Sequence, residues 1–435
     1  MSETPHADPA KHPVEVGFEV PGSDLTTAIR RAFPWVLLTR SLGLSFDLNK
    51  IAIAVAGLFV LQLAWSFLDS TLLDLETTKS VASLSVEARW RNALPAFPFS
   101  WVTGPLERLI EPIRVLVVPL LTFVSVHPLD AIGVHAGLAG LAAIATWGIA
   151  GGAIARIALV QVGWGRGLGA KSAIRYAAAH ARPLVATPLL PIVVLIITAI
   201  FCGIFGLIYR IPWFGEFLGG LFLLVPISLG LLMLVMVAGL ASSWPLMVAS
   251  VAAEGEDELD AVSRSFSYVN HRLVSYLFYG GIALLIGIPG SWLVDLVANG
   301  TLLMAQWGLG LTIPHYTVGQ IVTSTSSLLR PVDLSTATPT GQNSWSDVLP
   351  TFWIGCVRLS ARAWAFSYFW TSISLIYLII RKDVDGAEWS QLKPDPIDKD
   401  SLLDAFESKD VTRSTQSTLA ESPLPIPISE DSESA

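Results

Sequence analysis

Charged residues are scarce in this sequence, and their scarcity decides the class of protein. Asp, Glu, Lys and Arg together make up 14% of the 435 residues, whereas an ordinary soluble domain carries roughly a quarter. Hydrophobic residues make up 52%, and several uncharged runs reach the roughly 20 residues that cross the hydrocarbon of a bilayer. The composition argues against a soluble protein and predicts an all-α fold, a polytopic transmembrane helix bundle with interfacial amphipathic helices.

Cysteines and catalytic motifs are also sparse. Cys202 and Cys356 are the two cysteines, too few for a disulfide framework, and we treat them as free thiols. The sequence contains neither a nucleophile elbow nor a zinc-protease helix. His127, Asp130 and His135 come closest to a metal cluster, but a turn at the membrane interface accounts for them better. We therefore predict no catalytic, cofactor or metal residues and do not expect an enzyme.

Three regions of the chain differ in polarity. Residues 1–22 predict a disordered lead, and residues 390–435 predict a disordered acidic tail with 4 Lys/Arg against 10 Asp/Glu, a net charge of −6 (4 − 10). Residues 23–389 form the predicted transmembrane helical domain. Its six predicted spans are about 51–68, 136–155, 184–208, 217–241, 273–298 and 363–380. The apolar run Val115–Val126 is short for a span, so we interpret it as re-entrant or interfacial.

Basic residues indicate the orientation in the membrane. The loop between the second and third spans contains no acidic residue but five basic ones: Arg156, Arg166, Lys171, Arg175 and Arg182. Short loops rich in Lys and Arg stay on the cytoplasmic side. The segments before the first span, with Arg30 and Arg31, and after the sixth are basic as well, and six crossings place all three on one side. We therefore predict a bacterial inner-membrane protein with both termini in the cytoplasm.

Small residues recur at four-residue steps in the second predicted span. Gly140, Gly148 and Gly152 belong to this series, and small side chains on one helical face let two helix backbones approach closely in lipid. We predict that this face packs against another helix of the bundle. An interface between two copies of the chain is the alternative for the same face, so the oligomeric state stays open.

The stretch from Trp244 to Tyr279 joins the fourth and fifth spans through a short charged segment, which we call the elbow. Its apolar residues recur at steps of three and four, the pattern of one helical face: Leu259, Val262, Phe266, Val269 and Leu273. Acidic residues from Glu256 to Asp260 come first, and Arg264 and Arg272 come later, as the helix dipole favours. The pattern predicts an amphipathic helix in the inner headgroup plane.

The elbow also carries a family resemblance. The stretch WPLMVASVAAEGEDELDAVSRSFSYVNHRLVSYLFY, together with SYFWTSISLIYLIIRKDVDGAEW near the end, resembles a group of uncharacterised bacterial multi-pass membrane proteins. EGEDELDAVSRSF is more distantly similar to the six-helix membrane domain found beside some bacterial glycerophosphodiester phosphodiesterases. The resemblance implies a membrane fold and no activity, because the phosphodiesterase domain that would supply catalysis is absent from this sequence.

The predicted spans contain few ionisable residues, which argues against ion-coupled transport. Asp295 and Arg156 fall near predicted helix ends, within reach of water or headgroups. We expect a membrane-embedded interaction or scaffold protein with a lipid-facing cytoplasmic surface, partnered by membrane lipids and a protein, and not by nucleic acid. The candidate headgroup or partner contacts are Arg30, Arg31, Arg166, Lys171, Arg175, Arg182, Arg264 and Arg272. The alternative is a transporter or permease for a solute or lipid, with proline-broken helices lining its path.

Overall fold

The structure is a computed structural model that describes residues 34–72, 100–126, 130–211, 214–309, 311, 345–389 and 391–392. Within these residues every regular element is a helix, which confirms the all-α prediction. The elements are η1 (Pro34–Leu38), α2 (Thr39–Ser45), α3 (Leu48–Leu72), α6 (Ser100–Ser125), α7 (Ala131–Gly163), α8 (Ala170–Ala179), α9 (Ala181–Ile208), α10 (Phe214–Leu221), α11 (Leu224–Glu254), α12 (Glu258–His271), α13 (Leu273–Leu309) and α15 (Trp345–Asp385). Apart from 391–392, the predicted disordered ends lie outside the described residues.

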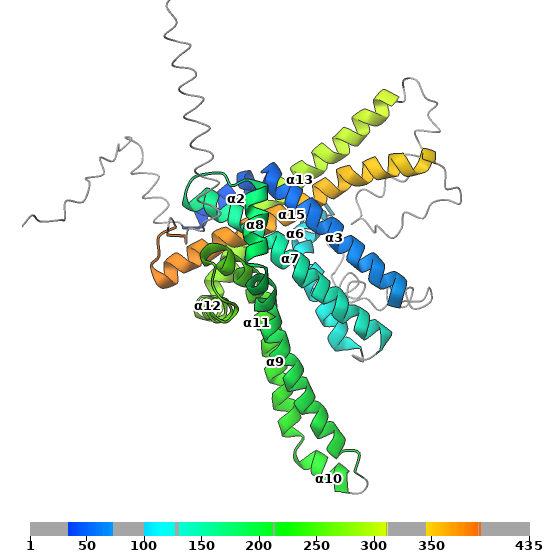
Figure 1. Ribbon diagram of the computed structural model, residues 1–435, viewed down its shortest axis with the longest axis vertical. Helices are drawn as coiled ribbons and strands as arrows, with labels where there is room; N and C mark the ends of the chain where they lie inside the picture. Colours follow the sequence, from blue (N-terminus) through cyan, green and yellow to red (C-terminus); the bar gives the residue numbers. More distant parts are fainter. Residues whose placement is uncertain are drawn as a thin grey trace, which may run out of the picture.

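Six helices are long and apolar enough to cross a membrane, as predicted. They are α3, α7, α9, α11, α13 and the Phe352–Asp385 part of α15. The helices associate in groups, α3 and α6 with α7, α9 with α11, and α13 with α15. Figure 1 shows these groups as arms that diverge from a common centre.

Helix α15 forms the core of that centre. In its most apolar stretch 94% of the residues are buried inside the protein, although the same kind of stretch would face lipid if the helix stood alone. Large aromatic side chains fill the space around it: Trp147 of α7 stacks on Phe366 with ring centroids 4.2 Å apart, and Trp244 of α11 meets Trp370 edge-on at 5.4 Å. Such rings bury large apolar areas with defined geometry. The centre is therefore a packed aromatic core.

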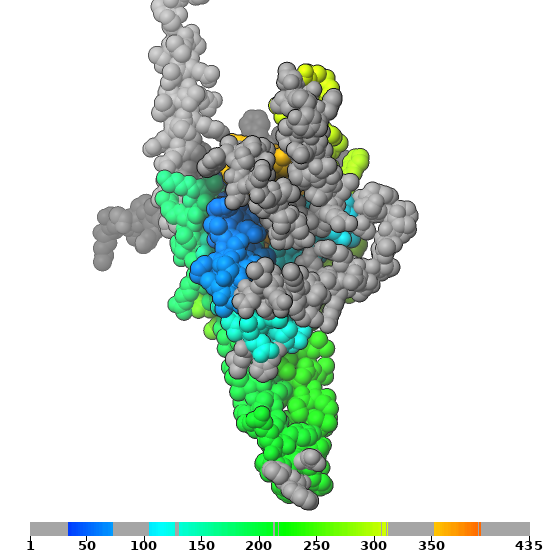
Figure 2. Space-filling view, turned by 90° about the vertical axis from the view of Figure 1, so that its right-hand side faces the viewer, coloured from blue at the N-terminus to red at the C-terminus, as the bar shows by residue number. Residues whose placement is uncertain are grey.

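The α9–α11 arm is mostly exposed, in contrast to α15. Only 11% of the apolar stretch of α9 and 6% of that of α11 are buried, and both views show the hairpin, with α10 at its tip, projecting beyond the other helices (Figures 1 and 2). An exposed apolar surface of this extent marks a membrane or partner contact. The arm therefore needs a covering that the described residues do not provide.

Several helices are longer than the predicted spans. The run Val115–Val126, predicted as re-entrant or interfacial, forms the second half of α6 as far as Ser125, and the charged residues N-terminal to it continue this helix of 26 residues. Helix α6 is not one of the six candidate spans among the described residues. The predicted span 217–241 is divided by a turn at Phe222–Leu223, and α11 instead continues through Pro245 to Glu254.

Lys50 stands directly before the first predicted span. Its side chain is fully buried, and the ammonium donates to the Leu44 carbonyl at 3.1 Å and to the Thr371 hydroxyl at 3.4 Å. A buried charge requires hydrogen-bonding partners, and these contacts fasten the beginning of α3 to the core helix α15. The neighbouring Arg40 is exposed and remains free to meet headgroups.

Candidate functional site

The elbow begins where α11 ends. Gly255 has a positive φ of 58° and its N–H donates to the Val251 carbonyl at 2.8 Å, the left-handed cap that glycine adopts without steric cost. The chain is then extended at Asp257, and α12 starts with Glu258 and Asp260 in its first turn, where the helix dipole favours anions. The predicted helix and its acidic start are thus present.

The buried face of α12 shares Val269 with the predicted apolar face but is otherwise different. Leu259 is 68% exposed and Leu273 is 47% exposed, whereas the buried residues of the helix are Ala261, Ser265, Tyr268 and Val269. The spacing of the apolar residues did not predict this buried face, because it places polar residues such as Ser265 on the outside of the helix. Tyr268 can be buried because its hydroxyl donates to the Asp385 carboxylate, which satisfies its polar atom.

Two glutamates and two arginines form the centre of the site. Glu254 forms ion pairs with Arg264 and Arg381, with Oε1 2.8 Å from both Arg264 Nη1 and Arg381 Nε, and Glu256 Oε1 lies 2.7 Å from Arg264 Nη2. We call these four residues the elbow cluster. It links the end of α11, the middle of α12 and the end of α15. Because each charge has an opposite partner, the cluster can remain ionised although all four side chains are largely buried.

Burial and hydrogen bonding set the protonation of groups around the cluster. Burial raises the pKa of the Glu256 carboxyl, against the opposing effect of the Arg264 charge. Burial also raises the pKa of Tyr268, and its hydrogen bond to Asp385 adds to the shift. Tyr268 therefore stays neutral at neutral pH and acts as a donor.

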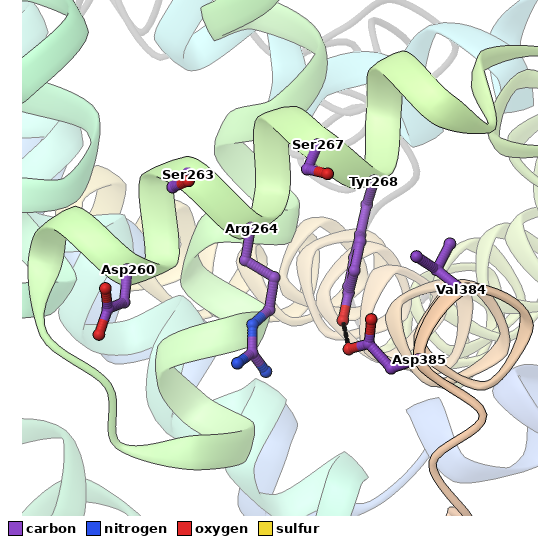
Figure 3. A pocket seen from close by; sticks show the side chains of 7 residues that line it. All are labelled: Asp260, Ser263, Arg264, Ser267, Tyr268, Val384 and Asp385. Carbon is purple, nitrogen blue, oxygen red and sulfur yellow. Dashed lines mark hydrogen bonds between the residues drawn. The ribbon is translucent and has the colours of Figure 1, made fainter.

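An open cleft lies beside the cluster. It has a volume of about 440 Å³ and is lined by Asp260, Ser263, Arg264, Ser267, Tyr268, Val384 and Asp385. Figure 3 shows the Tyr268 hydroxyl directed to Asp385 across the gap between α12 and α15, with Arg264 reaching out from the middle of α12. Beyond the cleft, Arg272 Nε lies 3.4 Å from Asp383. The end of α15 is thus tied to α12 at successive turns.

Arg156 corrects another expectation. It was predicted within reach of water or headgroups, but its side chain is fully buried. Its Nη1 donates to the carbonyls of Ala252 at 2.8 Å and Ala253 at 3.3 Å, and its guanidinium lies 4.4 Å from the Tyr176 ring centroid. The last carbonyls of a helix lack partners within it, so Arg156 caps α11 from α7. Its position in an otherwise apolar run was the signal that sequence reasoning undervalued.

The predicted basic contact residues divide into two sets. Arg182 pairs with Glu258 at 3.0 Å, and Arg264 and Arg272 make the ion pairs described above, so these three cations hold the elbow together. Arg166, Lys171 and Arg175 are exposed in and before α8. Arg30 and Arg31 lie outside the described residues.

The glycines of the predicted packing face lie against two different helices. A Cβ at Gly148 would lie 2.9 Å from the Leu184 carbonyl oxygen, and one at Gly152 would lie 2.8 Å from the Leu184 side chain. These two positions bring α7 against the start of α9. A Cβ at Gly140 would lie 3.5 Å from Pro119 of α6, an ordinary contact distance. Close approach therefore depends on Gly148 and Gly152.

Sequence reasoning missed a second charged cluster. Arg108 of α6 pairs with Asp295 of α13, and Glu111 of α6 pairs with Arg362 of α15, with side chains 22–26% exposed. The expectation that Asp295 lies near a helix end was wrong, since α13 continues to Leu309. The charges in the first half of α6 were the available signal, and the short-segment interpretation set them aside.

The residues that came closest to a metal cluster in the sequence, His127, Asp130 and His135, are only partly described by the structure. His127 lies outside the described residues, and His135 Nε2 lies 2.7 Å from Asp69 at the far end of α3. Among the described residues no three His, Cys, Asp or Glu side chains come together to hold a metal ion. Cys202 and Cys356 are both free.

Comparison of the chain with protein-family models, with curated proteins and with solved structures finds no match. The proposal for the function therefore rests on the geometry of the structure.

Proposed function

We propose that this chain is a multi-pass integral membrane protein that works as a membrane-embedded interaction or scaffold protein, with a lipid-facing cytoplasmic surface. The six apolar helices and the bare α9–α11 arm support the membrane part, because a surface of that kind is stable in lipid. The positive-inside pattern supports a cytoplasmic elbow and cytoplasmic termini in a bacterial inner membrane.

One observation favours a scaffold. The centre where the arms meet is filled by aromatic and aliphatic side chains, with Trp147, Trp244 and Trp370 fully buried, and the described cleft opens at the elbow. A transporter binds its substrate near the bilayer midplane. A packed centre suits a protein that holds its helix ends in fixed positions and presents them at one face.

Thiol labelling tests this proposal. Ser374 is fully buried in α15 and donates to the Trp370 carbonyl. With Cys202 and Cys356 replaced, Ser374→Cys in native membranes is expected to resist a hydrophilic maleimide, while Arg175→Cys in α8 reacts in permeabilised cells. Rapid labelling of Ser374→Cys, together with an unchanged melting temperature, would reveal a water-filled path and overturn the scaffold proposal.

A transporter or permease is the second candidate, and the Arg108–Asp295 and Glu111–Arg362 pairs favour it. Ionisable residues on membrane helices often mark a substrate or ion pathway. In proteoliposomes, a transporter of this kind would change the proton or cation permeability when Asp295 is replaced by Asn. A scaffold would show the same permeability in both proteins.

We also propose the family relationship that the elbow motif implied, with the bacterial multi-pass membrane proteins and the membrane domain beside some glycerophosphodiester phosphodiesterases. Support comes from the motif residues themselves, because Glu254, Glu256 and Arg264 are three of the four residues of the elbow cluster. A structure of such a membrane domain in which the matching acidic and arginine residues fail to pair would remove this support.

A further inference from the structure

The chain turns back after α15. Gly386 has a positive φ of 68°, and its N–H donates to the Lys382 carbonyl at 3.1 Å. Residues 387–389 and 391–392 then return to the end of α7, where a Cβ at Gly163 would lie 2.6 Å from Leu392 Cδ1 and 2.8 Å from the Trp389 carbonyl oxygen. Leu392 is 5% exposed. The acidic tail therefore departs from a fixed point beside the end of α7.

Helix α8 starts a few residues beyond that point. Its buried face is Ala173, Tyr176 and Ala177, and its other face exposes Lys171 and Arg175 with Ile174 between them. Unlike Arg182 and the elbow arginines, these two cations make no ion pair or hydrogen bond within the part of the chain that the structure describes. In Figure 2 this region forms part of the surface beside the start of α3.

The charges of the tail complement that face. Residues 393–435 carry 10 Asp/Glu against 4 Lys/Arg, and the last four charged residues, Glu421, Glu430, Asp431 and Glu433, are all acidic. Helix α8 has 10 residues, about 15 Å at 1.5 Å per residue. A chain spans up to about 3.3 Å per residue, so acidic groups of the tail can reach every turn of α8.

We propose that the acidic tail, residues 393–435, docks on the exposed face of α8 through Lys171 and Arg175. Tethering at Leu392 makes the encounter intramolecular, which gives the tail a high effective concentration at this face. The contact is electrostatic and exposed, so salt screens it. The tail then covers Lys171 and Arg175 and withholds them from other anions. This inference goes beyond the proposed function and does not depend on the side of the membrane that the face occupies.

Energy transfer in the full-length protein tests the docking. With Cys202 and Cys356 replaced, a donor on Ala178→Cys and an acceptor on Ser434→Cys report the distance between α8 and the end of the tail in a neutral detergent. High transfer is expected at about 0.02 M NaCl, with a clear fall by about 0.5 M. Lys171→Ser/Arg175→Ser should show the low transfer at both salt concentrations, while Arg40→Ser, which neutralises an exposed cation on α2, should match the wild type.

Equal transfer in the wild type and the double variant, or transfer that salt leaves unchanged, would overturn the proposal. Reconstitution identifies the competing occupant. If transfer is retained in nanodiscs of a zwitterionic lipid but lost in nanodiscs of an anionic lipid, the face belongs to lipid headgroups in the membrane and the tail is not its occupant. Retained transfer in both lipids supports the tail. Arg40, Lys171, Arg175 and Ala178 are exposed, and unchanged melting temperatures of the variants confirm intact folding.

Discussion

At the residue scale, the two elbow glutamates are unequal although both pair with Arg264. Glu254 also pairs with Arg381, whose side chain is 10% exposed, and the Tyr377 hydroxyl lies 3.4 Å from Glu254 Oε1. Removing Glu254 leaves a buried arginine without its opposite charge, whereas removing Glu256 leaves Arg264 paired with Glu254. Losing one partner of a buried pair is costly because the other charge remains desolvated.

Glu254→Gln is therefore expected to lower the stability by about 2–3 kcal/mol and Glu256→Gln by clearly less. Thermal melting of the purified protein, followed by tryptophan fluorescence in one detergent at neutral pH, measures both. Arg381→Met in the Glu254→Gln background should recover part of the loss, since it removes the orphaned charge. Equal melting temperatures for the two glutamine variants would contradict the assigned roles.

The raised pKa of Glu256 gives a pH dependence of defined sign. A folded-state pKa above the unfolded value means that the folded protein binds this proton more tightly, so the stabilising contribution is lost as the pH rises above the ordinary glutamate value of about 4.3. Glu256→Gln cannot ionise and escapes this loss. Its melting temperature relative to the wild type should increase from about pH 4 to about pH 7. A difference that stays constant or decreases would show that burial does not dominate at Glu256.

At the element scale, α7 approaches α9 through its glycines. A Cβ at Gly148 meets a backbone oxygen of Leu184 at 2.9 Å, and backbone cannot move aside cheaply. Gly148→Ala is therefore expected to cost about 1–3 kcal/mol through overpacking. Gly140→Ala, on the same helix with its nearest neighbour at 3.5 Å, is the matched control and should melt like the wild type. Equal loss in both variants would contradict close packing against Leu184 as the cause, since alanine favours the helix over glycine at both positions.

The helices show how much of the fold could be predicted from the sequence. Hydropathy and charge predict six long helices, an elbow helix and the basic loop, because length and composition follow directly from the bilayer as solvent. They do not predict that α12 buries Tyr268 and Ser265 while exposing Leu259, since that choice depends on Asp385 at the end of α15, far along the chain. Long-range partners of this kind are invisible to local periodicity.

Buried cations were the other failure of sequence reasoning. Arg156 was predicted within reach of water or headgroups because it falls near a predicted helix end, and no buried role was predicted for Lys50. Their partners are backbone carbonyls, Leu44 for Lys50 and Ala252 and Ala253 for Arg156. Every residue has a carbonyl, so composition carries no signal for such a site. The positions of Arg264 and Arg272 late in the elbow were read from the sequence. Their acidic partners could be identified only from the fold.

At the scale of the whole molecule, the arms diverge from one centre and the polar contacts gather where the helices end. The elbow cluster, the Arg156 cap and the return of Leu392 to Gly163 all lie at this end of the long helices. At the other end of α3 lie Asp69 and Thr71, of which Asp69 pairs with His135 at the start of α7. The structure therefore has two polar ends, and the Arg108–Asp295 and Glu111–Arg362 pairs interrupt the otherwise largely apolar length between them.

The most direct test of the proposal that this chain is a membrane protein with a cytoplasmic elbow is to determine on which side of the membrane each of these two ends lies. In sealed inverted membrane vesicles, with Cys202 and Cys356 replaced, Arg175→Cys in α8 is expected to react with a membrane-impermeant maleimide, and Thr71→Cys at the exposed end of α3 is expected to react only after permeabilisation. Labelling of both positions from the same side before permeabilisation would contradict the account.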